Sequence, residues 1–120
     1  MANVLAVDDS VSLRKLVAAT LTSAGHVVTE ASNGAEALEM IKKKQFNLII
    51  SDLNMPIMDG LTFIRQVRIL GAYKFTPILV LTTEMDPTKK KSAKESGATG
   101  WLVKPFDPEQ LLGTIRKVLG

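Results

Sequence analysis

Five short apolar runs, separated by segments of helical period, limit the fold of this chain more than any other feature of its sequence. The runs occupy residues 4–7, 27–31, 48–52, 78–82 and 101–103. Short apolar strands that alternate with helices are typical of repeated βαβ units around a parallel sheet, and not of a helical bundle or a β-sandwich. The pattern predicts an α/β protein with five strands and five helices.

The polarity of the runs predicts their order in the sheet. The runs that end at Val7, Asp52 and Thr82 are almost entirely apolar, as expected of central strands that are covered on both faces. The runs 27–31 and 101–103 are more polar or shorter, which places them at the edges. Because crossover connections are right-handed, helices reach both faces only if the strand order reverses once, and the simplest such order is 2-1-3-4-5. The order 2-1-3-4-5 is already known as that of doubly wound, flavodoxin-like sheets, so this agreement is not an independent result.

The helical segments between the runs contain their own start signals. Asn33 followed by Glu36 is typical of a capping box. Asp59, Asp86 and Asp107 each precede a glycine or a proline that suits the first turn of a helix. We therefore interpret these three aspartates as helix caps and not as ligands.

Apolar residues at helical spacing predict the buried face of the first helix. This helix is expected to begin near Ser10 or Val11, and positions three and four residues apart predict its buried stripe. The expected stripe is Leu13, Leu16, Val17, Leu21 and Ala24. The single histidine, His26, follows in an apparent loop and is expected at the surface.

The composition is that of one soluble globular domain. Of the 120 residues, 46% are hydrophobic and 22% are charged. No apolar stretch approaches the roughly 18 residues that cross a bilayer, and no signal peptide precedes the first strand, so we expect a cytoplasmic protein without membrane insertion. The absence of cysteine excludes disulfides, thiolate metal sites and thiol catalysis. A net charge of +3 without a recognition element does not indicate nucleic-acid binding.

Three aspartates stand at the ends of two central runs. Asp8 and Asp9 follow the run 4–7, and Asp52 ends the run 48–52. The carboxyl ends of parallel strands at a reversal of strand order are where α/β sheets bind ligands. Carboxylates about 4 to 6 Å apart repel each other by about 4 kcal/mol per pair at an effective dielectric of about 20, so a cation is expected among them. Oxygen ligands favour Mg²⁺, and the turn at Asn54 can add a backbone carbonyl.

Two further strand ends complete a site for a phosphoryl group. Thr82 places a hydroxyl and Lys104 places an ammonium at the same edge of the predicted sheet. Together with a hard cation, these groups can hold the equatorial oxygens of a phosphoryl group during transfer. Asp52 stands alone at its strand end, whereas Asp8 and Asp9 are adjacent and placed to hold the metal. We therefore predict that Asp52 is the nucleophile.

The stretches that contain these residues resemble the receiver domains of response regulators. They are VDDS at 7–10, SDLNMPIMDG at 51–60, LTTE at 81–84 and VKPF at 103–106. The resemblance spans the whole chain and implies that Asp52 accepts a phosphoryl group from the phosphohistidine of a kinase. It also implies that Asp9 and Asp52 contact Mg²⁺ with Asp8 close by, and that Thr82 and Lys104 bind the phosphoryl oxygens. A CheY-like fold follows from the same resemblance.

Within this family, the chain is most similar to single-domain chemotaxis regulators of the CheY type. Asn54 and Glu84 are residues that such proteins often carry near the phosphorylation site, where they are expected to set the lifetime of the phosphorylated state. Thr83 stands where alanine or glycine is frequent, and its β-branched side chain is expected to slow small phosphodonors. Trp101 replaces the usual tyrosine that turns inward on activation, and the larger indole is expected to hinder that movement. Thr82 and Trp101 are the predicted switch.

The resemblance implies a phosphorylation-controlled switch and not a metabolic enzyme. Residues 1–120 are expected to form a single receiver domain, monomeric and without an output domain. Its expected partners are a CheA-like sensor histidine kinase and a target such as a flagellar motor switch protein. As an alternative, the chain is a phosphate shuttle in a phosphorelay and passes the group to a histidine phosphotransfer protein. The Lys104–Pro105 bond is expected to be cis.

Two other interpretations are weaker. A Mg²⁺-dependent phosphohydrolase of the haloacid dehalogenase type needs a second acid that protonates the leaving group, and Asn54 stands at that position, where an amide cannot do so. The lysine-rich segment 89–94 is expected to be a solvated helix face. Its functional alternative is a surface for partner recognition together with Trp101 and the last helix.

Overall fold

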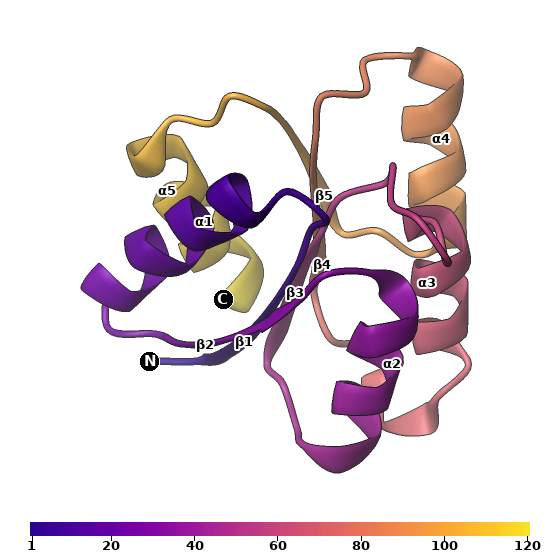
Figure 1. The fold of residues 1–120 in the computed structure, drawn as a ribbon, viewed down its shortest axis with the longest axis horizontal. Helices are drawn as coiled ribbons and strands as arrows, with labels where there is room; N and C mark the ends of the chain where they lie inside the picture. Colours follow the sequence, from indigo (N-terminus) through magenta and orange to yellow (C-terminus); the bar gives the residue numbers. More distant parts are fainter.

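The five strands form one parallel sheet in the order β2-β1-β3-β4-β5 (Figure 1). The computed structural model describes all residues 1–120. The strands are β1 Asn3–Val7, β2 Val27–Ala31, β3 Leu48–Ser51, β4 Ile78–Thr82 and β5 Gly100–Val103. The predicted order is confirmed, and the two strands predicted at the edges lie there.

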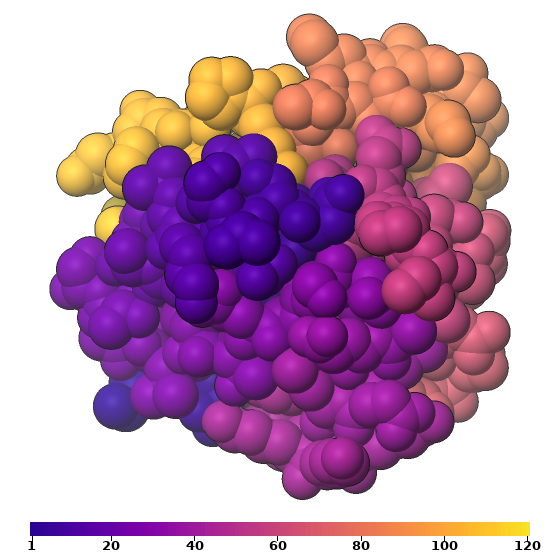
Figure 2. All heavy atoms as spheres, in the orientation of Figure 1, coloured from indigo at the N-terminus to yellow at the C-terminus, as the bar shows by residue number.

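Two layers of helices cover the sheet (Figure 1). The helices are α1 Val11–Ser23, α2 Gly34–Lys43, α3 Gly60–Arg68, α4 Pro87–Ser96 and α5 Pro108–Leu119, and a short 3₁₀ helix, η1, spans Gly71–Tyr73. In space-filling view, α1 and α5 adjoin on one side of the molecule and α4 lies on the other (Figure 2). The predicted five helices are confirmed, whereas η1 was not predicted.

Each face of the sheet has its own hydrophobic core. Side chains alternate along β1, so that Val4 and Ala6 join one cluster while Leu5 and Val7 join the other. The cluster under α1 and α5 includes Val17, Leu21, Leu111 and Ile115. The cluster under α2, α3 and α4 includes Ala37, Ile41, Phe63, Ile64 and Ala93. Burial on both faces explains why the central strands are continuously apolar.

The predicted helix caps are present. The side chains of Asp59, Asp86 and Asp107 each accept a hydrogen bond from a backbone N–H in the first turn of the helix that follows. Asn33 caps α2 by accepting from the N–H of Glu36 at 2.9 Å. The Glu36 carboxylate, however, accepts from the backbone and hydroxyl of Ser32 instead of from Asn33, so the box closes one residue earlier than predicted.

The buried stripe of α1 is narrower than its sequence predicts. Val17 and Leu21 are buried, but Leu16 is 52% exposed and Ala24 lies exposed beyond the end of the helix. Two positions four residues apart suffice for the contact with the sheet, and Leu16 is rotated away from that line by about 100°. The prediction for Leu16 and Ala24 was therefore wrong.

None of the helices is both long enough and apolar enough to cross a membrane.

One buried and one exposed phenylalanine allow a test of how much the hydrophobic core contributes to the free energy of unfolding. Phe63 is fully buried between α3 and the sheet, whereas Phe75 is 87% exposed after η1. We expect Phe63→Ala to lower the free energy of unfolding by about 3 to 5 kcal/mol, and Phe75→Ala to change it by roughly 0.5 kcal/mol or less. Urea titrations of the two variants measure the difference. Equal losses would contradict the assignment of the core.

His26 is half-buried, although the sequence predicted a surface residue. Its Nδ1 accepts a hydrogen bond from the N–H of Ala2 at 3.1 Å, which ties the start of the chain to the loop after α1. Burial lowers the pKa of His26, and the positive N-terminus adds to that effect. The folded protein therefore favours the neutral imidazole, which can accept this bond.

This lowered pKa predicts a dependence of stability on pH. As the pH falls below the pKa of histidine in the unfolded chain, about 6.5, the unfolded state binds a proton that the folded state resists. Stability should then decrease, and the decrease should stop below the folded pKa. We expect the urea midpoint to fall more steeply between pH 7.5 and 5 in the native protein than in His26→Gln. Parallel slopes would show that His26 does not titrate differently in the two states.

Candidate functional site

The ends of β1 and β3 place two carboxylates side by side. The strands are adjacent, with Val7 opposite Ser51, and the ladder continues through a hydrogen bond from the Asp52 N–H to the Val7 carbonyl oxygen at 3.0 Å. Asp8 and Asp52 therefore leave the sheet at the same level. Both are buried, with relative exposures of 6% and 8%.

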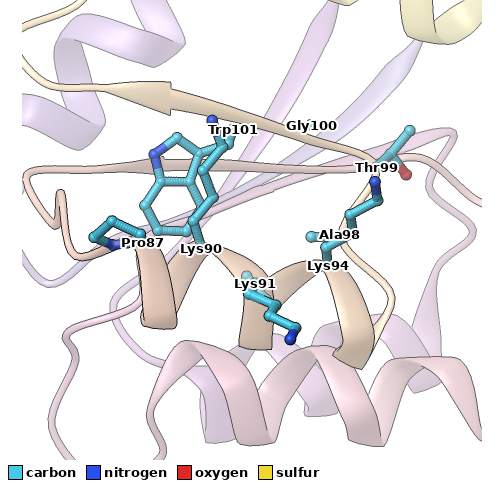
Figure 3. Close-up of a pocket in the computed structure, with 9 residues that line it drawn as sticks. Pro87, Lys90, Lys91, Lys94, Ala98, Thr99, Gly100 and Trp101 are labelled. Carbon is cyan, nitrogen blue, oxygen red and sulfur yellow. The ribbon is translucent and has the colours of Figure 1, made fainter.

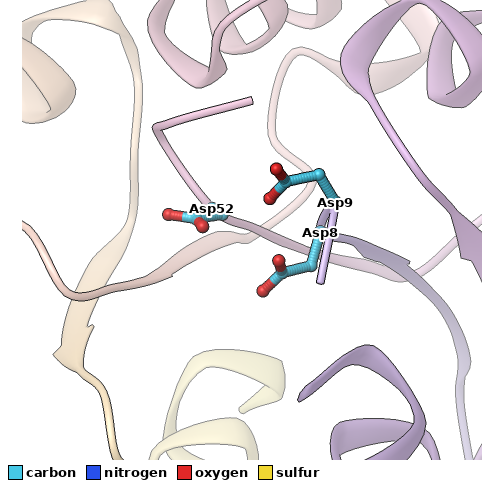
Figure 4. Close-up of side chains that lie close together, drawn as sticks. All are labelled: Asp8, Asp9 and Asp52. Carbon is cyan, nitrogen blue, oxygen red and sulfur yellow. The ribbon is translucent and has the colours of Figure 1, made fainter. Parts of the chain in front are cut away.

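Asp9 joins these two residues in one acidic cluster (Figure 4). One carboxylate oxygen from each of Asp8, Asp9 and Asp52 lies within 4.8 Å of the others. Asp9 is exposed, and its side chain makes no hydrogen bond or ion pair within the protein. The structure thus brings together the three acids that the sequence predicted to converge.

Lys104 enters the cluster from the end of β5. Its Nζ lies 2.5 Å from Asp8 Oδ2 and 3.1 Å from Asp52 Oδ2, and its side chain is almost completely buried. Burial by itself would lower the pKa of Lys104, but the hydrogen bonds and charges of the two aspartates outweigh it, and the net pKa is raised. The ammonium is therefore charged and partly neutralises the acidic cluster. The Lys104–Pro105 bond is cis, as expected.

Backbone groups fix the orientation of the two buried carboxylates. Asp52 Oδ1 accepts from the N–H of Leu53 at 2.7 Å and from that of Asn54 at 3.4 Å. Asp8 Oδ1 accepts from the N–H of Ser10 at 2.9 Å. In each residue one oxygen is held by the backbone and the other faces Lys104. This division leaves Asp52 Oδ2 pointing toward the shared space.

The loop after β3 returns to the site through Gly60. The Gly60 N–H donates to the Leu53 carbonyl oxygen at 2.8 Å. A Cβ atom at this position would lie 2.3 Å from the Asp52 carbonyl oxygen and 2.6 Å from Leu53 Cα, so only glycine fits without moving the backbone that carries Asp52. Ile57, at the outside of the same loop, has a positive φ of 70° and is 83% exposed.

The end of β4 supplies the hydroxyl of Thr82. This residue is fully buried, and its Oγ1 accepts from the N–H of Glu84 at 3.2 Å. Thr83, the next residue along the chain, is exposed, and Glu84 is half-buried. The backbone of Lys104 joins this end of β4, because its N–H donates to the Thr82 carbonyl oxygen at 2.8 Å.

Trp101 lies away from the acidic cluster, on β5 and facing α4 (Figure 3). It is half-buried and packs partly against the core beneath α2, α3 and α4. It also lines an open cavity of about 430 Å³ between α4 and β5, together with Pro87 and Lys90. The lysines of α4 at positions 89, 90, 91 and 94 are exposed, as the sequence predicted.

The donor set of the cluster fits a hard divalent cation. Three carboxylates offer oxygens to a common space, and Asp9 has no other partner. The carbonyl oxygen of Asn54 accepts no backbone hydrogen bond, so it too is available as a ligand. An all-oxygen set of this kind suits Mg²⁺, which takes few carboxylates, carbonyls and waters.

The sequence pattern did not predict a role for Arg14. It donates from Nη1 to the Asp8 carbonyl oxygen at 2.7 Å and from Nε to Glu30 at 2.9 Å. The ion pairs with Lys15 and Arg14 hold the pKa of Glu30 below its usual range. Arg14 thereby ties the loop that carries Asp8 to β2. An arginine on an otherwise apolar helix face was the only signal for this role in the sequence.

Comparisons with known proteins agree with the fold. The family model described as "Response regulator receiver domain" matches residues 4–116. A chemotaxis protein CheY homolog from Campylobacter jejuni is 38% identical over 118 residues, which cover 97% of this chain and 91% of the relative. The structure of the chemotaxis protein CheY4 of Vibrio cholerae superposes with a TM-score of 0.94 at 57% identity and covers 98% of each chain.

A segment of a larger protein is also similar to this chain. The sensor histidine kinase CheAY of Helicobacter pylori is 36% identical over 116 residues, which cover 95% of this chain and 14% of the kinase. The matched family model spans almost every residue described above, including all those at the strand ends. The chain therefore belongs to the family of response regulator receiver domains.

Proposed function

We propose that this protein carries the signal of a two-component pathway that controls chemotaxis, by accepting a phosphoryl group on Asp52 from a CheA-like histidine kinase. Membership of the receiver family makes the chain a phosphoacceptor in two-component signalling, homologous to the CheY regulators. The observation that carries the assignment of the residue is the convergence of Asp8, Asp9 and Asp52 with Lys104 at 3.1 Å from Asp52 Oδ2.

Asp52 is proposed as the nucleophile because it stands alone at the end of its strand, whereas Asp8 and Asp9 are adjacent. Its Oδ1 is occupied by the N–H of Leu53, and its Oδ2 faces the cluster. In the proposed step, Oδ2 forms a bond to phosphorus while the bond between phosphorus and the histidine nitrogen of the kinase breaks. The imidazole leaves with the bonding electron pair, and it leaves neutral if its other nitrogen carries a proton. The product is an acyl phosphate on Asp52.

Lys104 and Thr82 are proposed to hold the oxygens of the transferred group. The Lys104 ammonium lies next to Asp52 Oδ2, so it can turn from the carboxylate to a phosphoryl oxygen with little movement. The Thr82 hydroxyl can donate to a second oxygen, because its own oxygen already accepts from Glu84. Magnesium, bound by Asp8, Asp9, Asp52 and the Asn54 carbonyl, would neutralise charge on the phosphoryl oxygens.

Thr82 is also proposed to start the conformational response. The Thr82 hydroxyl accepts a hydrogen bond from the Glu84 N–H, so a movement of this hydroxyl toward the phosphoryl group pulls the backbone of Glu84 in the same direction. This displaces the loop between β4 and α4 and, through it, the wall of the cavity that Trp101 lines. Phosphorylation at Asp52 would thereby change the surface that α4 and β5 offer to a target such as a flagellar motor switch protein.

The phosphoacceptor assignment is tested with a small phosphodonor. The native protein should incorporate one phosphoryl group from acetyl phosphate, and beryllofluoride should change the fluorescence of Trp101, in both cases only with Mg²⁺ present. Asp52→Asn should lose both responses because an amide cannot form the acyl phosphate. Asp59→Asn, which alters an aspartate that caps α3, serves as the matched control and should respond like the native protein. Equal responses of the native protein and Asp52→Asn would refute the assignment.

The exposed Thr83 side chain is expected to limit access of small donors to Asp52. Thr83→Ala should increase the rate of labelling by acetyl phosphate severalfold, because it removes a β-branched side chain next to Thr82. Thr88→Ala removes a similar exposed side chain within α4 and should leave the rate unchanged. The measurement is the initial rate of phosphoprotein formation. A rate that does not change in Thr83→Ala would show that position 83 does not restrict the site.

Two further assays separate the competing functions: transfer of the phosphoryl group from the phosphorylated protein, and turnover of phosphate monoesters. A phosphorelay shuttle would pass its phosphoryl group to a histidine phosphotransfer protein in preference to a motor protein. A phosphohydrolase would turn over ordinary phosphate monoesters many times. The proposed regulator should neither prefer a histidine phosphotransfer protein to a motor protein nor hydrolyse phosphate monoesters in multiple turnovers.

A further inference from the structure

The C-terminal end of α4 is held by an arginine at the end of α3. Arg68 donates from Nε at 3.0 Å and from Nη2 at 2.7 Å to the carbonyl oxygen of Gly97. Its Nη1 donates to the carbonyl oxygens of Tyr73 at 2.7 Å and Thr76 at 2.6 Å, and to that of Lys74 at 3.5 Å. None of the salt bridges of the protein includes Arg68. One side chain therefore ties together α3, the segment before β4, and the cap of α4.

Packing and sheet contacts make this end of α4 a fixed point. Gly97 caps the helix with a φ of 119°, and a Cβ atom there would lie 2.7 Å from Arg68 Cγ. The stem of the arginine therefore fills the space that a side chain would need. Two residues later, Thr99 donates its N–H to the Ile78 carbonyl oxygen at 2.7 Å, and its Oγ1 accepts from the Ile78 N–H at 3.0 Å.

The remainder of α4 is held by few contacts. Ala93 is the only buried residue of its ten. The open cavity of about 430 Å³ that Trp101 lines runs along the helix from Pro87 to Lys94, so this side of α4 is not packed against β5 (Figure 3). The segment before the helix leads directly back to Thr82. The helix thus has one fixed end and one end connected to the phosphoacceptor site.

We propose that Arg68 is a positioning residue of the switch, which fixes the C-terminal end of α4 so that a displacement of segment 82–84 turns the helix about Gly97. A ten-residue helix is about 15 Å long, so a small shift at one end becomes a rotation when the other end is fixed. Without the anchor, the same shift moves the helix as a whole or unwinds its last turn. The proposal rests on the proposed function, because phosphorylation is the source of the displacement.

The test compares Arg68→Met with Arg65→Met. Both remove one positive charge from the last turn of α3, and both residues border the same groove toward α4. Arg65 is exposed and donates no hydrogen bond to α4, so it is the matched control. Three quantities are measured in each protein: the phosphoryl groups incorporated at saturating acetyl phosphate with Mg²⁺, the change in Trp101 fluorescence with beryllofluoride, and the amide hydrogen exchange of segment 93–99.

We expect Arg68→Met to incorporate the phosphoryl group to the same extent as the native protein, while its fluorescence change falls to less than half. Amide exchange in segment 93–99 should increase by about tenfold or more, because a charged donor to the helix cap is lost, whereas exchange in β1 and β3 should not change. Arg65→Met should match the native protein in all three. A native fluorescence change in Arg68→Met, or loss of its phosphorylation, would overturn the proposal.

A second variant covers the case in which Arg68→Met does not fold. Arg68→Lys keeps the charge and the stem but can no longer bond Gly97, Tyr73 and Thr76 together in a fork. It should incorporate the phosphoryl group like the native protein, and its change in Trp101 fluorescence should be reduced, though less than in Arg68→Met. A fluorescence change equal to that of the native protein would overturn the proposal. If the native protein itself took up no phosphoryl group, the proposed function would fail, and native-like exchange of segment 93–99 in Arg68→Met would still refute the anchor.

Discussion

The buried contact of Lys104 with Asp8 and Asp52 is the interaction on which the rest of the site depends. Three carboxylates lie at one edge of the sheet, two of them buried, and their mutual repulsion would oppose folding if no cation were near. The ammonium of Lys104 contacts Oδ2 of both buried aspartates, and Oδ1 of each accepts a hydrogen bond from a backbone N–H. The fold can therefore accommodate three carboxylates in one site. The third, Asp9, is exposed to solvent and has no partner within the protein.

The stiffness of the molecule is distributed unevenly around this site. The central strands and α3 are locked by fully buried side chains such as Ile49, Phe63 and Leu79, which hold the strand ends in register. By contrast, α4 buries one alanine and is fastened by polar contacts at its C-terminal end. A rigid sheet next to a loosely held helix suits a protein in which chemistry at one point must alter a surface at another.

Sequence patterns predicted the helices and strands well because the signals for an element lie within that element or next to it. Asp86 before Pro87 and Asp107 before Pro108 located two helix starts to the residue, since a cap needs only its own first turn. The pattern failed where burial depends on neighbours. Leu16 has an apolar side chain at a suitable spacing, but it is 52% exposed. His26 also was misjudged, because its partner is the start of the chain 24 residues away.

The sequence by itself determined the order of the strands and the identity of the acids, hydroxyl and lysine at their ends. These follow from hydrophobic patterning and from the rule that parallel strands share one carboxyl edge. Only the tertiary structure decided which of these groups touch. Lys104 lies 96 residues from Asp8 along the chain, and Arg68 lies 29 residues from Gly97, so neither contact leaves a trace in local sequence. Both form because the sheet and its crossovers bring distant strand and helix ends within a few ångströms, where charge and hydrogen bonding select the pairs.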